Sequence, residues 1–133
     1  MQSMNEAASV SKASLWTGRI LSTLAVLLFV AGGMFGILKP AAAMRGFAHY
    51  GYPDGVLLRL LIVEIVCGVL YAIPQTSIFG AILLTAYLGG ATATHVRAGE
   101  PFFLPIVVGI VVWLGVYLRD GRLRALVPLR KLN

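Results

Sequence analysis

Four long apolar stretches, separated by short polar links, account for most of the sequence. They run over about residues 15–38, 56–73, 76–95 and 102–118. About 20 mainly apolar residues are enough for an α-helix to cross a hydrocarbon core of about 30 Å. Short links place consecutive helices antiparallel to each other. The pattern therefore predicts an all-α integral membrane protein whose four helices form an antiparallel bundle.

The polar segments complete this predicted organisation. Residues 1–13 are polar and small, which indicates a cytoplasmic tail before a single helical domain over residues 14–118. The longest connection, 40–55, ends in turn residues, and its centre, 41–50, is expected to form a short interfacial helix. Residues 119–133 alternate arginine with leucine and valine, so they are expected to lie in the cytoplasmic interface.

Composition supports a membrane location. Of 133 residues, 59% are hydrophobic and 12% are charged, whereas a soluble domain carries about 25% charged residues. So small a body cannot bury all of its apolar surface, so we expect part of it to face the lipid bilayer. The first apolar stretch exceeds the ~7–15 residues of a signal-peptide core, which favours a retained helix.

Basic residues flank the predicted spans unevenly. Seven lie on the side that holds both termini and four on the other, which predicts that both termini are cytoplasmic. The formal net charge is +6, but no nucleic-acid-binding motif accompanies it, so we expect no nucleic-acid partner. The first group is Lys12, Arg19, Arg119, Arg122, Arg124, Arg130 and Lys131, and the second is Lys39, Arg45, Arg59 and Arg97.

One carboxylate interrupts the second apolar stretch, at Glu64 in LLIVEIVCGVLY. A charge facing lipid at such a depth costs ~2.5–3.5 kcal/mol, so Glu64 is expected to face the bundle. At ~1.5 Å per residue, Tyr87, Gly109 and the pair Gly32 and Gly33 fall at the same depth on the other three helices.

This shared depth leaves two interpretations open. In one, small residues open a pocket in which Glu64 and Tyr87 bind the polar end of a ligand, with Glu64 as a candidate catalytic acid. In the other, Glu64 is a polar clamp between helices and the glycines serve close helix packing.

A polar cluster is predicted above this level, nearer the surface. His95, Arg97 and Glu100 follow the third span, and Lys39 follows the first. They form either the mouth of a site, with His95 handling protons and Lys39 and Arg97 binding ligand, or an ordinary rim of snorkelling side chains. The chain's two histidines cannot complete a four-ligand zinc site, so no metal site is predicted. They could ligate a haem b, although no spacing favours it.

Several segments resemble the DoxX-like family of small four-helix bacterial membrane proteins. They are WTGRILSTLAVLLFVAGGMFGILKP, GYPDG, the block from Val63 to Pro101, and YLRDGRLRALVP. The resemblance covers nearly the whole chain, and the block from Gly89 to Pro101 is among its most specific parts. One departure is that many relatives carry a lysine in the first helix where this chain has Gly36.

What the resemblance implies is a bacterial inner-membrane bundle with quinone as a candidate ligand. Related DoxX proteins are associated with quinone-linked sulfur oxidation, as the small membrane subunit of an oxidoreductase. By position, Glu64, Gly89, Gly90, His95 and Arg97 match the family's recurrent polar and small residues.

Three functions remain open at this stage. The leading hypothesis is a membrane subunit of a redox complex that binds quinone, has no intrinsic cofactor and depends on a redox partner protein. The alternatives are a non-catalytic assembly subunit and a stand-alone membrane isomerase acting on a lipophilic substrate. No GxGxxG or P-loop pattern indicates a nucleotide-binding module. Homo-oligomerisation also stays open.

Overall fold

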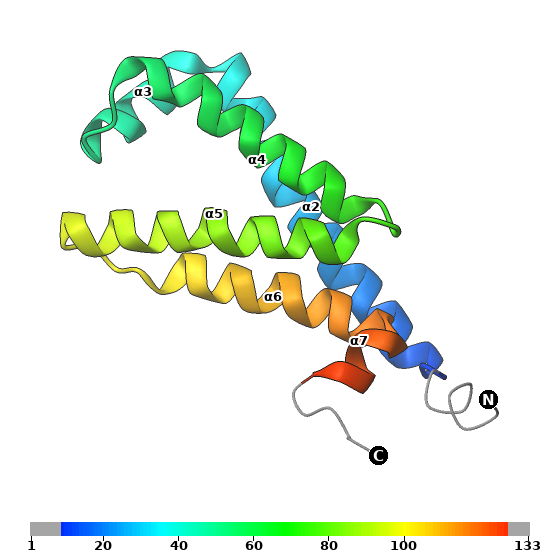
Figure 1. Cartoon of the computed structure of the whole chain (residues 1–133). Coiled ribbons are helices and arrows are strands. Elements are labelled where there is room, and N and C mark those ends of the chain that lie inside the picture. Colours follow the sequence, from blue (N-terminus) through cyan, green and yellow to red (C-terminus); the bar gives the residue numbers. More distant parts are fainter. Residues whose placement is uncertain (1–8, 128–133) are drawn as a thin grey trace.

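The structure is a computed structural model that describes residues 9–127, and within this range every regular element is a helix (Figure 1). The predicted all-α fold is thereby confirmed. The elements are α2 (Lys12–Leu38), α3 (Pro40–His49), the short 3-10 helix η1 (Asp54–Val56), α4 (Leu57–Ala72), α5 (Ser77–Ala98), α6 (Phe103–Arg119) and α7 (Gly121–Leu126).

Four of these helices form the predicted antiparallel bundle. Helix α2 packs against α4 and α6, and α5 also packs against α4 and α6, so the four helices close into a ring. We call the end where α2 begins and α6 ends the terminal end, and the end that carries α3 and the α5–α6 link the loop end (Figure 1).

The bundle helices are suited to a bilayer. The segments Lys12–Leu38, Asp54–Ala72 and Ser77–Ala98 are long and apolar enough to cross a membrane. Helix α6 is apolar and has 17 residues, which is at the lower limit of about 17 for a span. Large apolar side chains such as Leu27, Phe35 and Leu104 are exposed on the outside of the bundle. This surface fits contact with lipid.

The helix ends follow from local sequence. Pro40 begins α3, where its missing N–H costs nothing. Gly99 ends α5 with φ 72°, a left-handed conformation that favours glycine. The Asp120 side chain accepts from the backbone N–H groups of Arg122 and Leu123 and so caps α7. Helix α3 lies where a short helix was predicted, and the predicted basic tail forms α7 before residues 128–133, which lie outside the described range.

The core of the terminal half is close-packed around Tyr71, whose side chain is fully buried. Its hydroxyl donates to the Val112 carbonyl at 2.7 Å and accepts from Ser22 Oγ at 3.1 Å. A Cβ at Gly115 would come within 2.8 Å of this hydroxyl, and a Cβ at Gly80 would overlap the Tyr71 backbone. Glycine at these two positions therefore permits the close approach of α5 and α6 to Tyr71.

Candidate functional site

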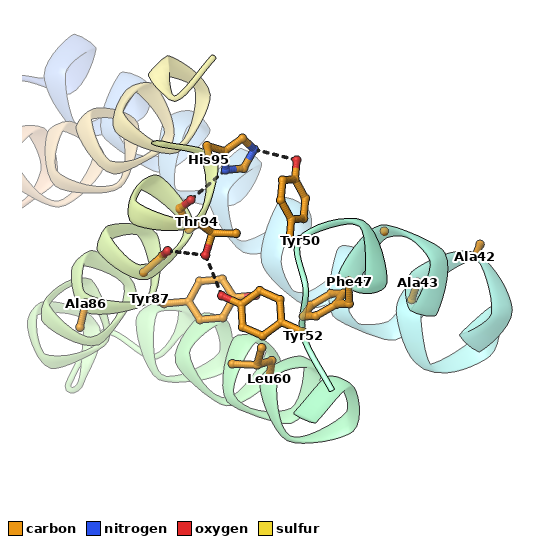
Figure 2. Close-up of a pocket in the computed structure, with 13 residues that line it drawn as sticks. Ala42, Ala43, Phe47, Tyr50, Tyr52, Leu60, Ala86, Tyr87, Thr94 and His95 are labelled. Atoms are coloured by element: carbon orange, nitrogen blue, oxygen red, sulfur yellow. Dashed lines mark hydrogen bonds between the residues drawn. The ribbon is translucent and has the colours of Figure 1, made fainter. Parts of the chain in front are cut away.

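A pocket of about 520 Å³ lies at the loop end, between α3, α4 and α5 (Figure 2). Most of its lining is apolar, and the polar groups are three tyrosine hydroxyls, one threonine and one imidazole. Its residues are Ala42, Ala43, Gly46, Phe47, Tyr50, Tyr52, Leu60, Ala86, Tyr87, Gly90, Ala91, Thr94 and His95.

Small residues on two helices create the space. Ala42, Ala43 and Gly46 lie on α3, and Ala86 and Gly90 stand four residues apart on one face of α5. A Cβ built on Gly46 or Gly90 would meet no atom within 4 Å. These glycines therefore border open space and do not serve close helix packing.

Tyr52 reaches from the α3–α4 connection to α5. Its hydroxyl lies 2.7 Å from Thr94 Oγ1, which in turn lies 2.9 Å from the Gly90 carbonyl (Figure 2). The single threonine proton goes to the carbonyl, because a carbonyl only accepts. Tyr52 is therefore the donor to Thr94, and its oxygen keeps a lone pair for a ligand.

His95 presents one ring nitrogen at the pocket mouth. Its Nδ1 lies 2.8 Å from the Ala91 carbonyl and so carries a hydrogen. Its Nε2 lies 3.4 Å from the Tyr50 hydroxyl (Figure 2). The proton of that hydroxyl is donated to Glu100 Oε2 at 2.7 Å. Nε2 of a neutral His95 therefore receives no proton from Tyr50, and it is free to accept one from a ligand.

Polar contacts around Glu100 fasten the end of α3 to the end of α5. His49 Nε2 lies 2.5 Å from Glu100 Oε1, and Arg97 Nη2 donates to the Tyr50 carbonyl at 2.8 Å. We call His49, Tyr50, Arg97 and Glu100 the loop-end latch. Hydrogen bonds from His49 and then Tyr50 lower the pKa of Glu100, and the bond to Glu100 is the main reason why the pKa of Tyr50 is raised.

Glu64 and Tyr87 meet, as their shared depth suggested. The Tyr87 hydroxyl donates to Glu64 Oε2 at 3.0 Å, and Glu64 is half-buried within the bundle. A Cβ at Gly32 would lie 3.3 Å from Glu64 Oε1, so Gly32 leaves room for the carboxylate. Tyr87 lines the pocket, but Glu64 is not among the residues that line it. Glu64 therefore influences the pocket only through its hydrogen bond to Tyr87.

Two residues that were predicted at the depth of Glu64 face other neighbours. A Cβ at Gly33 would collide with Ile65, so Gly33 is a close-packing position between α2 and α4. Gly109 lies beside Leu88 in a separate groove between α5 and α6. Depth along a helix does not specify which face a residue occupies: Gly32 and Tyr87 lie beside Glu64, whereas Gly33 and Gly109 face other neighbours.

The predicted rim residues also separate. His95 lines the pocket, whereas Arg97 contributes through the latch and Lys39 is exposed between α2 and α3, outside the lining. Among residues 9–127, no group of three or more His, Cys, Asp or Glu side chains is placed to hold a metal ion.

Sequence reasoning did not assign Phe47, Thr94 and the small residues of α3 to a pocket. Ala86, Gly90 and Thr94 are spaced four residues apart and so share one face of α5. This spacing is the one sequence feature that could have indicated the pocket wall on α5. The contribution of α3 had no comparable signal, because contacts from a connecting segment depend on how the chain folds back.

A comparison with known families agrees with this architecture. The model of the DoxX-like family matches residues 20–116, which include all of α4 and α5 and most of α2 and α6. No curated protein and no solved structure gives a significant match. Because the match extends over most of the chain and the fold is a bundle of apolar helices, this membrane protein belongs to the DoxX-like family.

Proposed function

We propose that the protein binds a small apolar molecule with a polar end in the loop-end pocket, with quinone as the best candidate. The observation that supports this is the pocket itself. Its volume of about 520 Å³ falls within the range of roughly 300–1,000 Å³ typical of small-molecule sites. Its apolar lining suits a quinone ring, and Tyr52, Tyr87 and His95 supply polar contacts.

The exchangeable protons of a quinone couple fit His95. A neutral His95 Nε2 accepts a hydrogen bond from a quinol hydroxyl, whereas a protonated one donates to a quinone carbonyl. Oxidation of a quinol to a quinone releases two protons and two electrons; His95 takes one of these protons, and the other passes to water at the loop end. The electrons pass to a partner protein, because redox chemistry needs an electron carrier that side chains do not provide.

Glu64 acts in this proposal as a positioning residue. Its carboxylate holds the Tyr87 hydroxyl at 3.0 Å and so fixes the orientation of the ring that forms one side of the pocket. The Tyr87 proton is used in this contact, so its oxygen faces a ligand as an acceptor. Glu64→Gln should therefore weaken quinone binding indirectly, through the tyrosine.

The proposed location is the bacterial inner membrane, with both termini in the cytoplasm. The excess of basic residues at the terminal end supports this orientation. The loop end then lies in the outer leaflet, where a quinone dissolved in the bilayer can reach the pocket from the hydrocarbon region.

Two adjacent glycines provide a matched test of the pocket. A Cβ at either Gly89 or Gly90 would have no atom within 4 Å, but only Gly90 lines this pocket. Gly90→Leu should weaken binding of a short-chain quinone analogue by about tenfold or more, the equivalent of ~1.4 kcal/mol. Gly89→Leu should change it less than about twofold.

The measurement is a fluorescence or calorimetric titration of purified protein in detergent. Equal affinities of the wild type, Gly90→Leu and Gly89→Leu for the quinone analogue would show that this pocket is not the binding site. Mass spectrometry and an absorption spectrum of the freshly purified chain then distinguish a bound quinone from haem b and from no ligand.

The Glu64–Tyr87 contact also supports a second candidate, a non-catalytic assembly subunit. Glu64 joins α4 to α5 without lining the pocket, as a polar clamp would. In that case Glu64→Gln lowers the thermal stability of the bundle, and no quinone affinity is detectable in the wild type. Product formation from a lipophilic substrate by the purified chain alone would instead support the isomerase alternative.

A further inference from the structure

A second cluster of polar residues occupies the terminal end, away from the pocket described above. Arg19 on α2 and Arg119 at the end of α6 both line two neighbouring cavities, of about 560 and 410 Å³. The two arginines stand where these cavities meet. This cluster lies at the opposite end of α5 from His95, so it is independent of the proposed quinone site.

Arg119 carries a charge that the described part of the chain does not compensate. Its Nε and Nη2 atoms are buried and have no hydrogen-bond partner among residues 9–127. The centre of its guanidinium group lies 5.5 Å from the centroid of the Tyr71 ring, so the ring face holds the side chain in place.

The nearby carboxylate is already engaged. Asp120 lines the larger cavity, and its Oδ1 accepts from the backbone of Arg122 and Leu123, but it forms no ion pair with Arg119. Within the described range the only ion pair joins His49 and Glu100 at the loop end. Guanidinium N–H groups that are buried without a partner are costly even in the partly buried side chain of Arg119, and an anion from outside the described residues would satisfy them.

The two cavities differ in chemistry. The larger one contains Arg19, Arg119 and Arg122 together with the Ser77 hydroxyl. The smaller one continues along α2 and contains Trp16 and Leu27, whose side chains are exposed on the outer surface of the bundle. A basic cavity therefore adjoins a more apolar one, which shares Arg19 and Arg119 with it, at the expected level of the lipid headgroups.

We propose that Arg19 and Arg119 bind the phosphate of an anionic phospholipid, whose acyl chain lies along the smaller cavity beside Leu27. Guanidinium groups bind phosphate oxygens through paired N–H donors, and basic pockets between membrane helices bind anionic headgroups. Inorganic phosphate has the same head-group chemistry but gains nothing from the apolar cavity, so the lipid is the expected occupant.

The test uses the purified full-length chain in a neutral detergent. Phosphatidylglycerol is added at rising concentrations, and bound lipid is counted by native mass spectrometry while thermal unfolding is followed in parallel. Phosphatidylcholine and inorganic phosphate serve as separate arms. We expect phosphatidylglycerol to bind and to raise the melting temperature, and we expect the other two to have little effect.

Variants locate the site. Arg19→Gln should weaken phosphatidylglycerol binding by about fivefold, the share of one arginine near a lipid surface. Arg19 is an exposed residue, so this variant should keep its fold. Arg119→Gln should weaken phosphatidylglycerol binding more than Arg19→Gln does. Arg59→Gln, an exposed arginine at the loop end, is the matched control and should leave binding unchanged.

Three results would overturn the proposal. One is equal stabilisation by inorganic phosphate, which would show a free-anion site. Another is an equal loss of lipid binding in Arg59→Gln and Arg19→Gln, which would show attraction by net charge alone. The third is equal binding of phosphatidylcholine and phosphatidylglycerol. None of them depends on quinone affinity, so the two proposals can fail separately.

Discussion

Glycine plays opposite roles around Tyr71 and on the loop-end half of α5. At the terminal end, Gly80 and Gly115 lie against Tyr71 so closely that a Cβ would collide with its backbone or hydroxyl. At the loop end, a Cβ at Gly89 or Gly90 would meet nothing within 4 Å. A glycine in a membrane helix therefore indicates close packing only where another helix is near.

Two tyrosines show the same difference. Tyr71 is fully buried, and its hydroxyl is shared between Ser22 and the Val112 carbonyl. Tyr87 is half-buried, lines the pocket and has its hydrogen bond to the Glu64 side chain. Tyr71 ties three helices together, whereas Tyr87 is placed between a carboxylate and an open space.

The largest expected effect tests the glycine contrast. Gly80→Ala should destabilise the protein by about 3 kcal/mol, because its Cβ would overlap the Tyr71 backbone, which cannot move cheaply. Gly90→Ala should change stability by less than ~0.5 kcal/mol. Thermal unfolding in detergent measures both. Similar melting temperatures for the two variants would show that Gly80 and Gly90 do not differ in packing.

The second prediction compares the two hydroxyls. Tyr71→Phe should destabilise the bundle by about 1–3 kcal/mol, because Ser22 and the Val112 carbonyl lose a buried partner. Tyr87→Phe should mainly weaken binding of the quinone analogue, and the melting temperature should fall less than for Tyr71→Phe. Titration and thermal unfolding of the same preparations separate these effects. If Tyr71→Phe altered the affinity for the quinone analogue more than Tyr87→Phe did, the proposed difference between the two tyrosines would be wrong.

The smallest effect concerns acid and the loop-end latch. The pKa of Glu100 is lowered in the folded state, so its carboxylate contributes stability above the unfolded value of about 4.3. This contribution is lost as the pH falls through the folded pKa. The protection of α3 against hydrogen exchange, relative to the intrinsic rate at each pH, should therefore fall below about pH 4, without a matching change around Tyr71.

In Glu100→Gln, α3 should already be less protected against hydrogen exchange at neutral pH, because a neutral amide replaces the charged acceptor of His49 and Tyr50. An α3 that exchanges at the same rate in Glu100→Gln and wild type would show that other contacts hold it. Arg45→Gln, an exposed substitution within α3 that lies outside the latch, is the control.

The helix pattern could be predicted closely from the sequence. The largest shifts between predicted spans and helices are three residues, at Lys12 against the predicted 15 and at Ala98 against the predicted 95. Hydrophobic length identifies a membrane helix almost by itself, because the hydrocarbon core has a nearly constant thickness. The inward orientation of Glu64 was also predictable, because a carboxylate facing lipid is costly.

The pocket depended on features that act at long range. Tyr50 and Tyr52 reach α5 across more than 40 residues of sequence, in contacts with His95 and Thr94. Gly109 was predicted at the depth of Glu64 but lies beside Leu88, because depth along a helix does not specify which neighbour a residue faces.

The sequence by itself determined the membrane helices, their antiparallel order and the inward position of Glu64, since these follow from hydrocarbon thickness, link length and the cost of a charge in lipid. Only the tertiary structure decided where the helices touch and where they leave space. Packing is a property of facing surfaces, so the same residue type closes the bundle at Gly80 and borders a pocket at Gly90.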